Sequence, residues 1–279
     1  MRFLILDAYS PAGREALVGA GGTPAGILYE RMLRRLAPES TIDVMHPADA
    51  SASLPEGVAI EHYDGALWTG SDLTVYDDQD SRVRRQIELA REIYRARVPS
   101  FGSCYGIQLA VVAAGGQCEP NPRGREFGVA REVRLSPEGR RHPMYAGKAS
   151  IFTGFTCHAD IVTSLPPGAI LLAGNQFSPV QSVDVEFQGG TFWAVQYHPE
   201  YDLSEVAALG RLRAEELVAQ GSFPDLGACH TYLRDLEELH ADPERDALAL
   251  ELGIGSDVLD VNQRTAEVRN WIETRVQAV

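Results

Sequence analysis

The first half of the chain alternates between short apolar runs and longer amphipathic segments. Phe3–Asp7 is an apolar run that ends in an acid, typical of a parallel strand buried on both faces. The spacing of apolar residues over Gly26–Leu36 and Ser81–Arg97 predicts amphipathic helices. The other predicted elements are strands at Thr41–His46, Gly65–Trp68 and Val98–Gly102 and a helix over Tyr105–Ala114. This alternation favours an α/β fold with an open, mostly parallel twisted sheet flanked by helices.

The pattern changes after residue 130. Five strand-like stretches follow, at Ala130–Leu135, Ala149–Phe152, Ile170–Ala173, Pro179–Phe187 and Thr191–Gln196. Helical patterns then cover residues 203–220, 224–240, 243–252 and 263–277. We expect residues 1–204 to form the α/β domain and residues 205–279 to form a helical C-terminal extension, in which Trp271 indicates burial. Residues 10–25 are rich in Gly, Ala and Pro, which predicts a loop.

Composition narrows the class of protein. Of 279 residues, 44% are hydrophobic and 23% are charged, as in an ordinary globular protein. The formal net charge of -14 disfavours nucleic acid as a partner, because phosphates carry the same sign of charge. The sequence shows no membrane span, and its apolar N-terminal run is too short for a signal peptide. Four cysteines without C-x-x-C spacing indicate neither a metal site nor a redox pair, so we expect free thiols in the cytoplasm.

The densest chemical signal is the segment Phe101–Gln108 (FGSCYGIQ). Cys104 follows a predicted strand and precedes a predicted helix, with Gly102 and Gly106 two residues away on either side. Small flanking residues permit a tight strand-to-helix turn that presents a nucleophile above the sheet. The helix N-terminus is expected to favour the thiolate, and the backbone N–H of Tyr105 is a natural donor to an oxyanion. The alternative for this motif alone is a buried structural cysteine.

A cysteine nucleophile needs a base, and the base needs an orienting group. Gln196–Glu200 (QYHPE) supplies both at the end of a predicted strand. His198 and Glu200 are two residues apart and point the same way in an extended chain, so Glu200 can hold the useful tautomer of His198. Five other histidines are interpreted as surface residues, namely His46, His62, His142, His230 and His240.

With these motifs the chain resembles the class I glutamine amidotransferases, most closely the glutaminase domain of GMP synthetase. The segments that carry the resemblance, in the expected order within residues 1–205, are Val98–Glu119, Arg125–Gly128 (REFG), Thr156–Pro166 (TCHADIVTSLP) and Ala194–Glu200 (AVQYHPE). The third segment is similar to the S-H-G-D-K-V loop of the family. The resemblance implies a flavodoxin-like glutaminase fold.

The resemblance also implies a role for each site residue. Cys104 would attack the side-chain amide carbon of glutamine, His198 would transfer the protons, and Glu200 would orient His198. The backbone N–H groups of Gly70 and Tyr105 would bind the oxyanion. The implied substrate-binding residues are Gln108, Ser71, His158 and Asp160. Neither a metal nor an organic cofactor is implied, because the triad supplies nucleophile, acid and base.

Two loops depart from the pattern of the family. Thr69–Ser71 stands where the family usually has Gly-Gly-Pro, and Cys157–Ile161 (CHADI) replaces the S-H-G-D-K sequence. These changes leave the triad intact but put the substrate and the partner surface in doubt. For His158 and Asp160, a purely structural role is an equal alternative. The sequence also lacks a P-loop and an SGG-type pyrophosphatase loop, so we expect no synthetase half.

Three functions remain open at this point. The first is a glutaminase that passes ammonia to a synthetase or another acceptor protein, with low activity when alone. The second is a stand-alone hydrolase of γ-glutamyl amides or peptides, slightly favoured by the altered loop at Cys157–Ile161. The third is a non-catalytic binding or regulatory relative, which the complete triad disfavours. The helical extension is also a candidate surface for a homodimer.

Overall fold

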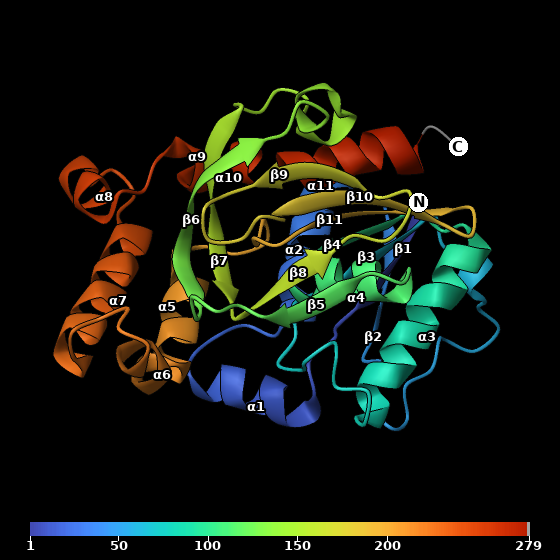
Figure 1. Cartoon of the computed structure of the whole chain (residues 1–279), viewed down its shortest axis with the longest axis horizontal. Helices are drawn as coiled ribbons and strands as arrows, with labels where there is room; N and C mark the ends of the chain where they lie inside the picture. The colour runs from blue at the N-terminus through green and yellow to red at the C-terminus, as the bar shows by residue number, and fades with distance from the viewer. Residues whose placement is uncertain (278–279) are drawn as a thin grey trace.

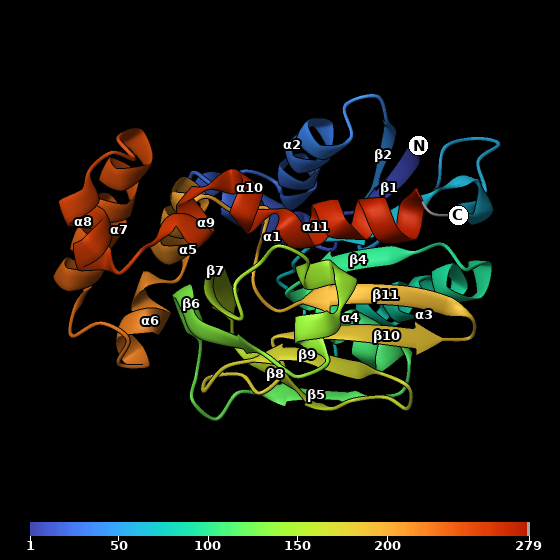
Figure 2. The same cartoon turned by 90° about the horizontal axis from the view of Figure 1, so that it is seen from above.

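The computed structural model describes residues 1–277, which form a large central sheet with helices on both faces (Figure 1, Figure 2). The nine strands of this sheet have the order β2-β1-β3-β4-β11-β10-β9-β6-β7. They are β1 Arg2–Leu6, β2 Thr41–Met45, β3 Gly65–Trp68, β4 Ser100–Ser103, β6 Glu126–Leu135, β7 Ile151–His158, β9 Ile170–Gly174, β10 Ser182–Phe187 and β11 Gly190–Val195. A separate two-stranded sheet pairs β5 (Gln117–Pro120) with β8 (Asp160–Ser164).

The helices lie between and beyond these strands. They are α1 Pro11–Gly19, α2 Ala25–Leu36, α3 Ser81–Ala96, α4 Tyr105–Ala113, α5 Leu203–Leu212, α6 Ala214–Ala219, α7 Leu226–Ala241, α8 Asp246–Leu252, α9 Ser256–Leu259, α10 Val261–Arg264 and α11 Ala266–Trp271. Short 3-10 helices cover Ile60–His62, Gly139–Arg141 and Pro143–Tyr145, and a π-helical turn covers Ile272–Val276. Within residues 1–277, none of the helices combines the length and the apolar character needed to cross a membrane.

The central sheet has a parallel half and an antiparallel half. β2, β1, β3, β4 and β11 run parallel to one another, whereas β10, β9, β6 and β7 are added by antiparallel pairing. In the parallel half, Trp68 pairs with Gly102, and Ser103 pairs with Val195. The carboxyl ends of β3, β4 and β11 therefore lie side by side, where open α/β sheets bind their ligands. The predicted α/β fold with an open sheet flanked by helices is confirmed.

Two hydrophobic cores cover the two faces of the sheet. On one face, the sheet packs against α3 and α4; on the other, against α2 and the C-terminal α11. The predicted burial of Trp271 is confirmed, because its side chain is fully buried. Its ring centroid lies 6.0 Å from that of Phe3 and 6.1 Å from that of Phe101.

The predicted loop over residues 10–25 is wrong in part, because Pro11–Gly19 forms α1. Ser10 Oγ accepts a hydrogen bond from the Gly13 N–H at 3.0 Å, which caps this helix. Pro11 occupies the first turn, where a missing N–H costs no intrahelical bond. Strands β5 and β8 were also not predicted; they are short and pair only with each other.

The residues after 202 are helical, as predicted, but the segments are broken differently. The pattern expected over 203–220 splits at Arg213 into α5 and α6, and α9 is an additional short helix. Helices α5–α8 lie beyond β6 and β7 at one end of the sheet, and the chain then returns so that α11 runs over the sheet (Figure 1, Figure 2). The boundary between residues 204 and 205 stays a prediction.

Candidate active site

Three strand ends meet at one point above the parallel half of the sheet. β3 leads to Gly70, β4 leads to Cys104, and β11 leads to the segment with His198. A methyl group built on Gly70 would lie 3.1 Å from His198 Cε1 and 3.7 Å from Cys104 Cβ. The fold thus brings together the three segments that the sequence singled out.

Cys104 lies on a strained turn between β4 and α4. Its φ of 54° and ψ of -104° are unusual for a residue other than glycine. A Cβ on Gly102 would lie 3.0 Å from Gly106 Cα, and a Cβ on Gly106 would lie 2.9 Å from the Trp68 carbonyl oxygen. The predicted close approach of strand and helix at these two glycines is confirmed.

His198 and Glu200 form a buried pair beside this turn. His198 Nδ1 lies 2.6 Å from Glu200 Oε1, and both side chains are almost fully buried. Since a carboxylate accepts, Nδ1 carries the hydrogen and Nε2 keeps a lone pair. Nε2 is buried and has no hydrogen-bond partner within residues 1–277. The expected contact is present, while the catalytic roles of Cys104, His198 and Glu200 stay a proposal.

Three further residues support this pair, and the sequence interpretation missed them. Ser103 Oγ donates to Glu200 Oε1 at 2.9 Å, and the Tyr29 hydroxyl lies 2.7 Å from Ser103 Oγ. Tyr201 stacks on His198, with ring centroids 3.7 Å apart and planes within 5°. Ser103 and Tyr201 are chain neighbours of the predicted triad, which was the available signal. Tyr29 comes from α2 and carries no such signal.

The thiol of Cys104 does not have the ionisation that its helix N-terminus predicted. The pKa of the Cys104 thiol is raised to about 12, mainly by burial and to a smaller extent by the electrostatic effects of Cys157 and Glu200. Arg125 and the Tyr105 N–H act in the opposite direction but do not offset burial. The expected thiolate is therefore wrong for the unliganded protein, because desolvation of a buried charge outweighs the helix dipole.

A cavity of about 230 Å³ opens onto the thiol. Its lining includes all four predicted substrate-binding residues and several that were not predicted: Tyr9, Ser71, Asp72, Leu73, Thr74, Cys104, Tyr105, Gln108, Arg125, Cys157, His158, Ala159, Asp160, His198, Tyr201, Leu209 and Arg213. Cys157, a buried free thiol, also lines this cavity. In residues 1–277, no three His, Cys, Asp or Glu side chains are grouped to hold a metal.

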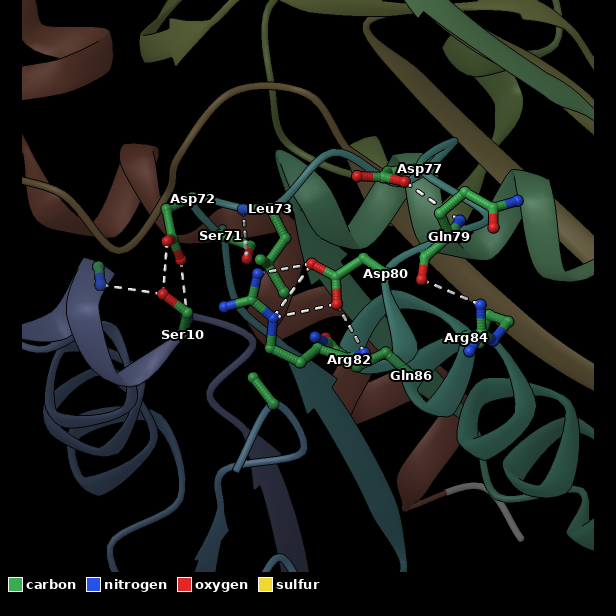
Figure 3. Close-up of polar contacts among 12 residues, drawn as sticks. Ser10, Ser71, Asp72, Leu73, Asp77, Gln79, Asp80, Arg82, Arg84 and Gln86 are labelled. Atoms are coloured by element: carbon green, nitrogen blue, oxygen red, sulfur yellow. Dashed lines mark hydrogen bonds and ion pairs between the residues drawn. The ribbon is translucent and has the colours of Figure 1, made fainter. Parts of the chain in front are cut away.

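The loop after β3 is anchored at both ends (Figure 3). At its start, the N–H and hydroxyl of Ser10 bind Asp72 at 2.7 and 2.6 Å. At its end, Asp80 accepts from the Arg82 N–H at 2.8 Å and caps α3. Ser71 Oγ donates to the Ala8 carbonyl at 2.8 Å, so its hydroxyl already anchors the loop. This loop places one wall of the cavity.

Gln108 and Asp160 lie together in the lining of the cavity. Gln108 Nε2 is 3.4 Å from the Asp160 carbonyl oxygen, and Asp160 Oδ1 accepts from the Tyr76 hydroxyl at 2.7 Å. Contacts of Gln108, Ser71 and Asp160 with a substrate stay predictions.

His158 lines the cavity, but both of its ring nitrogens are engaged by protein groups. Nδ1 donates to the Asp160 carbonyl at 2.9 Å, and Nε2 lies 2.8 Å from Glu126 Oε2. Glu126 also accepts from Asn175 at 2.7 Å and from Gln181 at 2.8 Å. Although burial opposes it, hydrogen bonding and the charge of His158 lower the pKa of Glu126 below its usual value. This geometry favours the structural alternative, in which His158 positions the turn between β7 and β8.

His142 is not the surface residue that its sequence position predicted. Its side chain is 11% exposed, and Nε2 lies 3.1 Å from Asp184 Oδ2. Its ring also packs edge-on against Trp193, with centroids 4.7 Å apart. The 3-10 turn at Pro143–Tyr145 folds this histidine back onto the sheet, which the local sequence did not indicate.

Fold and site define an α/β protein with a cysteine on a strand-to-helix turn and a His–Glu pair on the neighbouring strand end. Residues 32–208 match the family model described as glutamine amidotransferase class-I. The chain therefore belongs to the class I glutamine amidotransferase family.

Two curated relatives match different shares of the chain. Gamma-glutamyl-L-1-hydroxyisopropylamide hydrolase from a Pseudomonas species is 33% identical over 278 residues, covering 98% of this chain and 92% of that protein. A glutamine-hydrolyzing GMP synthase from Porphyromonas gingivalis is 36% identical over 141 residues, but covers 50% of this chain and 26% of that protein. The chain is thus an enzyme, an amide hydrolase of the class I glutamine amidotransferase type.

Solved structures extend the likeness in fold over the whole chain. A glutamine amidotransferase from Thermotoga maritima superposes with a TM-score of 0.67 at 18% identity, covering 99% of this chain and 98% of that one. Another, from Methylobacillus flagellatus, has a TM-score of 0.66 at 20% identity, covering 98% and 94%. At these identities the likeness concerns the fold alone.

Proposed function

We propose that this enzyme is a stand-alone hydrolase of γ-glutamyl amides that acts through Cys104, His198 and Glu200. The observation that carries the proposal is the buried His198 ring, whose Nδ1 is bound by Glu200 while Nε2 has no protein partner within residues 1–277 beside the Cys104 turn. The match to the Pseudomonas hydrolase covers nearly the whole chain, whereas the GMP synthase match covers half. This favours a γ-glutamyl amide over an ammonia-delivering role.

The first chemical step would form a thioester. The substrate carbonyl oxygen would point to the backbone N–H groups of Gly70 and Tyr105, and Cys104 Sγ would attack the carbonyl carbon. Because burial raises the pKa of the thiol, transfer of its proton to His198 Nε2 accompanies the attack instead of preceding it. Glu200 stabilises the resulting imidazolium.

The second part of the reaction would release both products. His198 donates its proton to the amide nitrogen, the C–N bond breaks, and the free amine leaves a γ-glutamyl thioester on Cys104. Water then attacks the thioester carbon while His198 accepts a proton, and glutamate leaves as the thiol regains its hydrogen. When the substrate is glutamine, the amine released is ammonia. We place this activity in the cytoplasm, as expected from the sequence.

A second candidate is a glutaminase that supplies ammonia to an acceptor protein. The 36% identity to GMP synthase over 141 residues favours it. It uses the same three residues and the same thioester. It differs in that hydrolysis would be slow until the acceptor protein binds.

The test is glutamate release by the purified full chain from glutamine, γ-glutamyl-ethylamide and γ-glutamyl-glycine. Cys104→Ala is compared with Cys229→Ala, which removes a buried thiol from α7, outside the cavity. We expect the wild type and Cys229→Ala to hydrolyse the substituted amides, and Cys104→Ala to be inactive. Acid quenching should trap one γ-glutamyl unit on the wild type. Turnover of none of the amides by the wild type would contradict the stand-alone hydrolase.

A further inference from the structure

Two arginines line the catalytic cavity, and one of them belongs to the helical extension. Arg125 precedes β6, whereas Arg213 lies between α5 and α6. Arg213 is outside residues 32–208, the stretch that matches the family model. The cavity around Cys104 is therefore completed by a residue beyond the matched domain.

The position of Arg213 is fixed by the helix break on which it lies. Its φ of -119° and ψ of 13° interrupt the helical backbone, and its N–H donates to the Gly210 carbonyl at 3.2 Å. Helix α5 cannot move away easily, because Gly210 is pressed against neighbouring side chains. A Cβ there would lie 2.8 Å from Phe127 Cζ of β6 and even closer to Leu233 of α7.

Glu216 holds both arginines at once. Arg125 Nε lies 3.0 Å from Glu216 Oε1, and Arg213 Nη1 lies 3.4 Å from Glu216 Oε2. One carboxylate thus serves two guanidinium groups, so the Arg125–Glu216–Arg213 cluster carries one surplus positive charge. Two acids also line the cavity, and both are hydrogen-bonded to other residues: Asp72 to Ser10 and Asp160 to Tyr76.

Arg213 also has unused hydrogen-bond donors. A guanidinium carries five N–H groups, and the contact with Glu216 is long and uses one nitrogen. Its Nε is buried and has no partner within residues 1–277. Because the Arg213 guanidinium lines the cavity, its unused terminal donors are in position to bind an anionic group of a ligand.

We propose that Arg213 binds a carboxylate of the substrate, so that the helical extension determines substrate specificity at the active site. The inference rests on the proposed γ-glutamyl amide hydrolysis and names a group that recognises the substrate. A planar guanidinium suits a carboxylate because it can donate two parallel hydrogen bonds. The carboxylate is either that of the glutamyl α-carbon or one on the amine that leaves.

The test compares Arg213→Met with the wild type on three amides. γ-Glutamyl-glycine carries both carboxylates, γ-glutamyl-ethylamide carries only the α-carboxylate, and 4-aminobutanamide carries neither. Loss of a charged hydrogen bond should raise KM for the amide with the recognised carboxylate by on the order of 10- to 100-fold, with little change in kcat. A rise for both γ-glutamyl amides identifies the α-carboxylate, and a rise for γ-glutamyl-glycine alone identifies the leaving amine. In both cases kcat/KM for 4-aminobutanamide should stay unchanged.

Two control variants separate recognition from general damage. Arg213→Lys keeps the positive charge, so its KM should lie between those of the wild type and Arg213→Met. Arg234→Met removes an exposed arginine from α7 and should leave KM and kcat unchanged. An equal loss on all three amides, or no loss on any, would overturn the role of Arg213.

A binding measurement keeps this inference separate from the proposed function. γ-Glutamyl-glycine is titrated calorimetrically into Cys104→Ala with and without Arg213→Met, where no turnover is needed. Weaker binding to the double variant supports carboxylate recognition by Arg213, even if the wild type hydrolyses none of the amides. That absence of hydrolysis would refute only the proposed hydrolase function. Equal binding to both proteins refutes carboxylate recognition whether or not the wild type is active.

Discussion

The molecule contains two buried His–Glu pairs near one cavity, and they differ in how many of their polar atoms have partners. In the pair His198–Glu200, the atoms Nδ1 and Oε1 lie 2.6 Å apart, and His198 Nε2 and Glu200 Oε2 have no partner within residues 1–277. In the pair His158–Glu126, the corresponding distance is 2.8 Å, and both ring nitrogens and both carboxylate oxygens are engaged. A free lone pair permits proton transfer, whereas full satisfaction stabilises a turn.

Under the proposed mechanism, residue type and burial do not separate the reactive histidine from the structural one. Both histidines carry a carboxylate partner, and both were candidates from the sequence. What separates them is the second ring nitrogen. In His198 this nitrogen is Nε2, which has no partner within residues 1–277. In His158 it is Nδ1, which donates to the Asp160 carbonyl, while Nε2 contacts the Glu126 carboxylate.

The largest effect is expected when the same substitution is made at both histidines. His198→Asn should lower kcat by about 10⁴-fold or more, because the general base is lost. His158→Asn should lower kcat by less than about 10²-fold, since it only loosens a cavity wall, but should lower Tm. Steady-state kinetics and thermal melting on both variants measure this difference. Equal losses of kcat would show that the two pairs do not differ in role.

Substitution of the two carboxylates, Glu200 and Glu126, should also affect kcat to different extents. Glu200→Gln keeps the shape but loses the charge that orients His198, so kcat should fall by about 10²- to 10⁴-fold. Glu126→Gln should leave kcat within about tenfold and lower the free energy of unfolding by about 3 kcal/mol, because a buried pair is broken. Urea unfolding beside steady-state kinetics tests both. A Glu126→Gln variant as inactive as Glu200→Gln would contradict the structural assignment of Glu126.

The protonation state of the Cys104 thiol decides whether His198 Nε2 is still free to accept its proton. With a pKa of about 12, Cys104 is a neutral thiol at pH 7 and has not given its proton to His198. The rate of alkylation by iodoacetamide should therefore rise about tenfold per pH unit from pH 7 to pH 10. Mass spectrometry of the labelled thiol follows this rate, with Cys104→Ala giving the background. A rate that levels off near neutral pH would reveal a preformed thiolate–imidazolium pair.

Glu126 should make stability depend on pH in the acidic range. Its pKa is lower in the folded chain than its ordinary value of 4.5, so the carboxylate stabilises the fold above that pH. This stabilisation is lost as pH falls through the folded-state pKa. The Tm difference between wild type and Glu126→Gln should thus be largest near pH 6 and should shrink below pH 4. A difference that stays constant over this range would refute the contribution of the charge.

Ser103 should have the smallest effect. Its hydroxyl donates to Glu200 Oε1 at 2.9 Å, and it is one of two donors to that oxygen. Ser103→Ala should lower kcat by about three- to tenfold, as expected for one hydrogen bond of about 1 kcal/mol. Ser100→Ala, at the start of the same strand, serves as the matched control and should keep full activity. Identical kinetics for Ser103→Ala and wild type would remove Ser103 from the support of Glu200.

Local patterns predicted the elements that carry the site because their signals are short-range. Gly102 and Gly106 around Cys104 predict the turn from steric size alone, and His198 and Glu200 share a face because side chains alternate along extended chain. The hydrophobic pattern did not predict elements whose formation depends on a capping side chain or on a partner strand distant in sequence. Helix α1 depends on Ser10, whose own position depends on Asp72.

The sequence by itself determined the strands and helices that carry the site, the cysteine turn and the His–Glu pair, because contacts within a few residues dictate each of them. The tertiary structure decided what chemistry these residues can perform. It buried the Cys104 thiol and raised its pKa, occupied both ring nitrogens of His158, and brought Arg213 to the cavity from beyond the matched domain. Desolvation and hydrogen-bond satisfaction arise from residues distant in the chain, and no local pattern encodes them.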